Sequence, residues 1–199
     1  MANHAKVCSA ATNNGDALPL FLVGSSMGGS IALKVAEHMA DLIQGVIMLA
    51  PMLSLKVSIM ERIALSALSM FIPTVPLIPS SATTPDKQYR DPQRRVECEA
   101  DEMSYKGKLR VSSALTCVDL ASTISESFNN ITVPILCMVA QEDVVVDNTK
   151  VDEFFESAKS GDKTLKSYKA LHGLLCELEP LRSAIEKDLV QWIVFRCNA

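Results

Sequence analysis

The feature of this sequence that most constrains its fold is the pentapeptide Gly24-Ser25-Ser26-Met27-Gly28. An apolar run precedes it at residues 18–23, and a helix-compatible segment follows it at residues 29–37. The G-x-S-x-G pattern is common by itself. Between a strand and a helix, however, it is typical of a nucleophile elbow, the sharp turn that exposes a reactive serine at the carboxyl end of a strand. We therefore predict that Ser26, the central residue of the pattern, is a nucleophile, in preference to its neighbour Ser25.

The rest of the chain alternates apolar runs of strand length with helix-like segments. Runs that are apolar on both faces are typical of strands buried inside a parallel sheet. We therefore predict an α/β fold, with a partial parallel sheet flanked by helices. The predicted strands cover residues 18–23, 45–50, 135–139 and 164–168, and the predicted helices cover residues 29–37, 151–159 and 181–195. The residues expected to face the core from the first of these helices are Ile31, Val35, Ala36 and Met39.

Residues 52–130 interrupt this alternation and contain no strand-like run. We predict that they form a helical cap, or lid, inserted into a core made of residues 1–51 and 131–199. The expected parts of the cap are helices over residues 58–71 and 111–127 and a charged, loop-like stretch over residues 85–110.

A serine hydroxyl needs a base to take its proton, and histidine is the usual one. The chain contains three histidines. His4 lies in a polar segment without a core pattern, and His38 is expected to face solvent from the helix after the elbow. His172 follows the last predicted strand by a short loop, which places it at the same edge of the sheet as Ser26. We therefore predict His172 as the base.

The base in turn needs a carboxylate that orients it and stabilises its protonated form. Asp143 comes directly after the predicted strand at residues 135–139. It gives the chain order serine, acid, histidine that hydrolases built on a nucleophile elbow use. The neighbouring Glu142 and Asp147 remain alternatives for the acid.

The negative oxygen that forms during acyl transfer needs two N–H donors. One donor is the N–H of the residue after the nucleophile, here Met27, and the other usually comes from an earlier loop with a His-Gly motif. The sequence has no such segment, and the elbow begins only 23 residues into the chain. We therefore expect the chain to hold only the C-terminal part of a larger fold, which would leave the strand at residues 18–23 at a sheet edge.

Composition narrows the environment and the partners. The formal net charge of −4 gives no basic surface, so we expect no nucleic-acid partner. The six cysteines are widely spaced and no signal peptide is visible, so we predict reduced, mostly buried thiols in a cytoplasmic protein. No apolar run reaches the roughly 18 residues that span a bilayer. We expect neither a cofactor nor a metal.

Together these segments resemble the monoacylglycerol lipase-type α/β-hydrolases, which are lysophospholipase-like serine hydrolases. The matching segments are residues 19–29, 45–52, 105–110 and 133–136 with Asp143, then residues 162–166 and His172 with Glu177. The resemblance implies hydrolysis of the ester bond of a monoacylglycerol or a similar single-chain lipid, through a Ser-His-Asp triad and an acyl-enzyme. It also implies that the cap forms an apolar tunnel for the acyl chain and touches the membrane surface peripherally.

Two other functions remain open. The first is a truncated, catalytically impaired hydrolase-like protein that binds a lipid or a partner chain, which the missing oxyanion loop favours. The second is an esterase or thioesterase that acts on a small soluble acyl substrate, which the long apolar cap disfavours.

Overall fold

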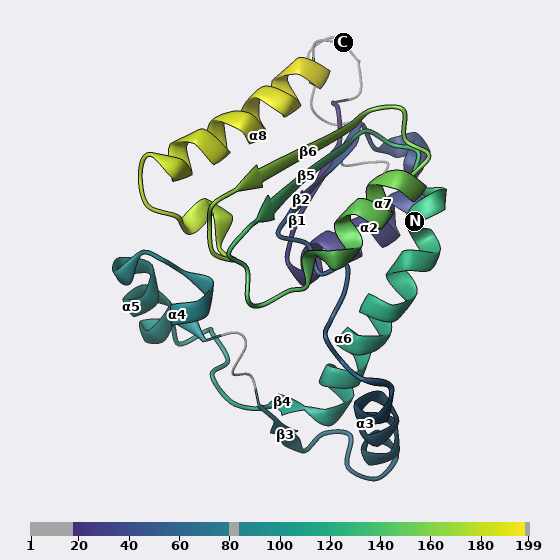
Figure 1. Ribbon diagram of the computed structural model, residues 1–199, viewed down its shortest axis with the longest axis vertical. Helices are drawn as coiled ribbons and strands as arrows, with labels where there is room; N and C mark the ends of the chain where they lie inside the picture. Colours follow the sequence, from purple (N-terminus) through teal and green to yellow (C-terminus); the bar gives the residue numbers. More distant parts are fainter. Residues whose placement is uncertain (1–17, 80–83, 198–199) are drawn as a thin grey trace.

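The computed structural model describes residues 18–79 and 84–197. Its centre is a four-stranded sheet in the order β1-β2-β5-β6, and every neighbouring pair is parallel (Figure 1). The strands are β1 Phe21–Ser25, β2 Gly45–Leu49, β5 Ile135–Ala140 and β6 Lys163–Tyr168. The four predicted strands and their parallel arrangement are confirmed, with ends that differ by a few residues. As expected, β1 lies at a sheet edge, where its Val23 is 54% exposed.

Helices cover both faces of this sheet, with α2 and α7 on one face and α8 on the other (Figure 1). Successive side chains of β2 alternate between the two faces, as the pleat of a strand requires. Val46 and Met48 pack in the cluster under α2 and α7, whereas Ile47 and Leu49 pack in the cluster under α8. The helices are α2 Met27–His38, α7 Val151–Ser157 and α8 Leu181–Cys197, with short 3-10 turns at Ala40–Leu42, Asn148–Lys150 and Leu174–Cys176.

The buried face of α2 overlaps the expected one, because Ala36 is buried and Val35 and Met39 pack partly buried against the core, but Ile31 does not belong to it. Ala32, Leu33 and Ala36 are buried, whereas Ile31 is 46% exposed. The reason is the close approach of the helix to the chain after β2. A Cβ added at Gly29 would lie 2.8 Å from the Cβ of Pro51. The helix therefore packs against the core with the face that carries Gly29, because only a small residue fits at this contact.

The segment between β2 and β5 contains more regular structure than predicted. Residues 85–110 are not a loop, because two short helices form there, and two short strands pair antiparallel where no strand was expected. Strands of two or three residues carry no alternating pattern that a sequence could reveal. The elements are α3 Ile59–Phe71, β3 Pro76–Ile78, α4 Pro85–Gln88, α5 Pro92–Ala100, β4 Leu109–Arg110, α6 Val111–Thr123 and the 3-10 helix Ile124–Asn130.

Helix α3 packs against α6 at the end of α6 that lies away from the sheet (Figure 1). Its first turn is closed by a capping box, in which Ser58 and Glu61 satisfy each other's backbone N–H groups. None of its residues is buried, and the apolar side chains of Met60, Met70 and Phe71 are each more than 70% exposed. Across residues 18–79 and 84–197, no helix combines the length and apolar character needed to cross a bilayer.

The cysteines in the described part of the chain are free thiols. Cys137 is buried, Cys197 is exposed and the other three are intermediate, so the expectation of mostly buried thiols is wrong. Cys8 lies outside the described residues.

Candidate active site

The turn between β1 and α2 holds Ser26 in a strained backbone conformation, with φ 54° and ψ −124°. Such conformations cost about 1–3 kcal/mol and persist only where the surroundings fix them. Two hydrogen bonds fix this one: the Ser26 N–H donates to the Leu49 carbonyl at 2.9 Å, and the Met52 N–H donates to the Ser26 carbonyl at 3.0 Å. The serine is thereby locked to the carboxyl end of β2.

The glycines of the motif have different roles. A Cβ on Gly24 would lie 2.1 Å from the carbonyl oxygen of Gly28, which is backbone and cannot move aside. A Cβ on Gly28 would meet no described atom within 4 Å. The sharpness of the elbow therefore depends on Gly24, which lets β1 and the first turn of α2 touch.

The loops after β5 and β6 bring Asp143 and His172 together. The His172 Nδ1 atom lies 2.7 Å from the Asp143 Oδ2 atom, and the two side chains are 7% and 0% exposed. The other carboxylate oxygen of Asp143 accepts hydrogen bonds from the N–H groups of Val145 and Val146 at 2.8 and 3.1 Å. A carboxylate only accepts hydrogen bonds, so Nδ1 carries the ring proton and Nε2 keeps its lone pair.

Ser26 and His172 line one cavity of about 250 Å³. The rest of its wall is mostly apolar, and part of it comes from the segment between β2 and β5. The other lining residues are Ser25, Leu49, Gln88, Tyr89, Val145, Gly173, Leu174, Leu175 and Cys176. Two of the three predicted residues, Ser26 and His172, thus line one small cavity, and the third, Asp143, contacts His172 through the hydrogen bond described above.

The rejected alternatives have other partners. Glu142 pairs with Arg90 at 2.6 Å, and this hydrogen bond lowers the pKa of Glu142 below its usual value. Asp147 accepts from the N–H and the hydroxyl of Thr149. His38 is exposed at the end of α2, and His4 lies outside the described residues.

Met27 is the first residue of α2. The first N–H groups of a helix have no acceptor within it, and the positive end of the helix dipole lies there. The Met27 N–H therefore lies at the N-terminus of α2, directly after Ser26 in the chain. Its side chain is 44% exposed, and its sulfur lies 3.8 Å from the Cys117 sulfur of α6.

Sequence reasoning missed the segment at residues 88–90, which had been assigned to a loop of the cap. The Gly173 N–H donates to the Gln88 carbonyl at 2.8 Å. A Cβ on Gly173 would lie 2.6 Å from the Tyr89 ring. The segment therefore lies directly against the residue after His172, and the only local signal for it is a Tyr-Arg pair within a charged run.

Comparisons with known proteins agree with this architecture. The family model described as "Serine aminopeptidase, S33" matches residues 1–179. Monoglyceride lipase of Mus musculus is 26% identical over 188 residues, which make up 92% of this chain and 60% of that protein. Caffeoylshikimate esterase of Arabidopsis thaliana is 28% identical over 183 residues, 88% of this chain and 55% of that protein.

Solved structures show the same fold. The crystal structure of a soluble variant of monoglyceride lipase from Saccharomyces cerevisiae, in complex with a substrate analog, matches with a TM-score of 0.81 at 22% identity. The match covers 98% of this chain and 67% of that one. This chain spans 55–60% of the length of the two curated relatives above.

Proposed function

The chain belongs to the serine aminopeptidase S33 family and has the α/β-hydrolase fold, and on this premise we propose that it is a serine hydrolase that cleaves the ester bond of a monoacylglycerol or a similar single-chain lipid. The observation that carries the proposal is the 2.7 Å hydrogen bond between His172 and Asp143 beside the cavity that Ser26 lines. A histidine oriented by a buried carboxylate, next to a serine on an elbow, is the arrangement that activates a hydroxyl for acyl transfer.

In the proposed reaction the Ser26 Oγ attacks the ester carbonyl carbon while the His172 Nε2 takes the hydroxyl proton. Asp143 holds the ring in place and stabilises its positive charge. Collapse of the tetrahedral intermediate breaks the bond to the glycerol oxygen, and His172 protonates that oxygen as the alcohol leaves. Water, deprotonated by His172, then attacks the acyl-serine ester, which releases the fatty acid and restores Ser26.

The Met27 N–H is the proposed donor to the oxyanion of each intermediate. Removal of one such donor typically lowers the rate by about 10²–10³. A single donor would therefore support slow turnover, and the catalytically impaired alternative predicts that turnover is too slow to detect.

The lipid substrate is inferred from three features. The cavity beside Ser26 has mainly apolar walls, the relative from Mus musculus is a monoglyceride lipase, and α3 presents exposed apolar side chains. An apolar helix surface at the edge of the molecule suits contact with the lipid phase in which a monoacylglycerol resides. Peripheral membrane contact through this segment is part of the proposal.

The test is covalent labelling of the intact chain by a fluorophosphonate, which reacts only with an activated serine. We expect labelling of the wild type, loss of labelling in Ser26→Ala, and labelling close to wild type in the matched control Ser25→Ala. A folded wild-type chain that takes up no label would refute the hydrolase proposal and favour the impaired, lipid-binding or partner-binding alternative.

A second candidate is an esterase or thioesterase that acts on a small soluble acyl substrate. Two observations favour it: the cavity of about 250 Å³ is small for a long acyl chain, and one relative is named for caffeoylshikimate. The ratio of kcat/KM for long-chain over short-chain glycerol esters separates the two. A ratio above one supports the lipid substrate, and a ratio below one supports the small ester.

A further inference from the structure

We propose that Arg90 is a positioning residue, which holds the loop of Asp143 and the loop of His172 in their mutual geometry by binding one carboxylate on each. This inference rests on the proposed function, because it assigns a role to Arg90 in the same reaction. Arg90 comes from the segment between β2 and β5, far in sequence from both loops.

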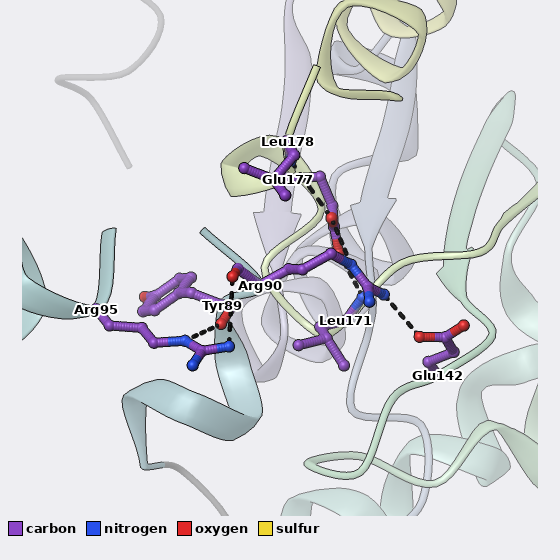
Figure 2. Close-up of polar contacts among 7 residues, drawn as sticks. All are labelled: Tyr89, Arg90, Arg95, Glu142, Leu171, Glu177 and Leu178. Atoms are coloured by element: carbon purple, nitrogen blue, oxygen red, sulfur yellow. Dashed lines mark hydrogen bonds and ion pairs between the residues drawn. The ribbon is translucent and has the colours of Figure 1, made fainter. Parts of the chain in front are cut away.

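Figure 2 shows the Arg90 guanidinium between two carboxylates. Its Nη2 donates to Glu142 at 2.6 Å, and its Nε donates to Glu177 at 3.1 Å. The remaining oxygen of Glu177 accepts the Leu171 N–H at 2.7 Å. One arginine therefore connects the residue before Asp143 with the residue before His172 (the latter through Glu177).

These contacts add to a direct backbone connection between the two loops. The Gln141 N–H donates to the Tyr168 carbonyl at 2.8 Å, and the Glu142 N–H donates to the Ala170 carbonyl at 3.0 Å. Both bonds lie before the catalytic residues and are backbone only. Apart from the Asp143–His172 hydrogen bond itself, Arg90 provides a side-chain link between the two loops at Glu142 and Glu177.

Arg90 is itself held from the other side. Arg95 of α5 donates to the carbonyls of Tyr89 and Arg90, at 2.7 and 3.3 Å (Figure 2). The Gln88 carbonyl accepts from the N–H of Gly173. The segment is thus anchored on α5 and contacts the residue directly after His172, and these contacts restrict the position of the Arg90 guanidinium.

Burial explains why this link matters more than a surface ion pair. Arg90 and Glu142 are each 36% exposed, which screens their attraction. The side chain of Glu177, however, is 2% exposed, and a buried carboxylate needs charged or hydrogen-bonding partners. Removal of the guanidinium would leave Glu177 without its cation and leave two carboxylates to repel each other. A lysine at this position is a point charge and cannot serve both carboxylates in the fork geometry of arginine.

The test compares Arg90→Gln and Arg90→Lys with a matched control, Arg62→Gln. Arg62 also pairs with a carboxylate, that of Asp119, but on the exposed face between α3 and α6. We expect the rate constant of fluorophosphonate inactivation at saturating probe to fall about 10- to 100-fold in Arg90→Gln, the scale at which a misplaced catalytic group lowers a rate. The probe concentration at half-saturation stays unchanged, Arg90→Lys recovers only part of the rate, and Arg62→Gln matches the wild type.

A second readout does not depend on turnover. The Nδ1 proton that His172 shares with Asp143 gives a low-field signal in proton NMR, and we expect it in the wild type and Arg62→Gln but not in Arg90→Gln. If Arg90→Gln does not fold, Glu142→Ala replaces it, because this variant keeps the Arg90–Glu177 pair and removes only the acceptor on the acid loop. A wild type that shows the signal but takes up no label refutes the proposed function alone, and the NMR comparison then decides the role of Arg90. An unchanged signal and an unchanged rate in folded Arg90→Gln overturn the inference, and so does the absence of the signal from the wild type.

Discussion

Replacement of Asp143 by asparagine tests the proposed chemistry most directly, because the surroundings of this side chain dictate how the amide must sit. The two N–H groups of Val145 and Val146 point at one carboxylate oxygen. In Asp143→Asn they select the amide oxygen, and the NH2 group must then face the His172 Nδ1. The opposite orientation would set the NH2 group against two backbone donors, at a cost of about 1–3 kcal/mol for each unsatisfied group.

With an NH2 group facing it, Nδ1 must accept a hydrogen bond, and the ring proton moves to Nε2. Nε2 then has no lone pair with which to take the proton of Ser26. In a serine protease triad the same replacement lowers kcat by about 10⁴, which corresponds to about 5.4 kcal/mol of transition-state stabilisation. The free energy of unfolding should fall by only about 1–3 kcal/mol, because the three hydrogen bonds of the carboxylate are kept but become bonds of a neutral amide.

The assay is the second-order rate constant of fluorophosphonate labelling, with urea unfolding measured on the same samples. Asp147→Asn is the matched control, because Asp147 lies in the same loop and caps Thr149 instead of contacting His172. We expect the control to label at the wild-type rate. A folded Asp143→Asn chain that labels within tenfold of the wild type would show that Asp143 does not orient the base.

Two further predictions concern the elbow. Gly24→Ala should lower the free energy of unfolding by about 3 kcal/mol, because the new Cβ meets backbone at 2.1 Å. Gly28→Ala has open space around the new Cβ and should raise the free energy of unfolding by about 0.5–1 kcal/mol. Urea unfolding measures both changes, and equal effects of the two variants would contradict the close contact at Gly24. Ser26→Gly should raise the free energy of unfolding by about 1 kcal/mol relative to Ser26→Ala, because glycine tolerates the positive φ of 54°. Both Ser26 variants should lose labelling, and identical melting temperatures would argue against backbone strain at the elbow.

The sequence was sufficient to predict the sheet. The two central strands, β2 and β5, are short apolar runs with both faces buried, and this pattern depends only on residue type. The edge strand β6 is mostly exposed, as its alternation of polar and apolar residues predicts. Motif order also predicted that Ser26, Asp143 and His172 lie at one edge of the sheet, because parallel strands bring their carboxyl ends together. The structure places Ser26 and His172 on one cavity and joins His172 to Asp143, and their joint role in catalysis stays a prediction. Ile31 shows the limit of this reasoning: helical spacing indicates which residues share a face, but the close approach at Gly29 decides which face is buried.

The part of the site that sequence missed is built from long side chains across distant segments. Arg90 lies in a charged run, where most charges face solvent. Nothing in its local sequence indicates that two carboxylates more than fifty residues away will accept hydrogen bonds from its guanidinium. Glu177 belongs to a matching segment of the family resemblance, but its burial follows only from the packing of the loop after β6. Such pairings are set by tertiary structure, which neither periodicity nor turn chemistry encodes.

The pairing of β2 with β5 has a consequence for how the chain folds. The pairing of Val46 with Ile135 closes a loop of about ninety residues. The pairing of Val46 with Leu22 of β1 closes a much shorter loop. The extra length adds roughly 1 kcal/mol of loop-closure entropy to the β2–β5 pairing. The β1–α2–β2 and β5–α7–β6 units should therefore form early and independently, and their joining along β2 and β5 should limit the folding rate. Ser26 belongs to the first unit and His172, the proposed base, to the second, so the proposed reactivity toward an acyl group should appear only in that last step.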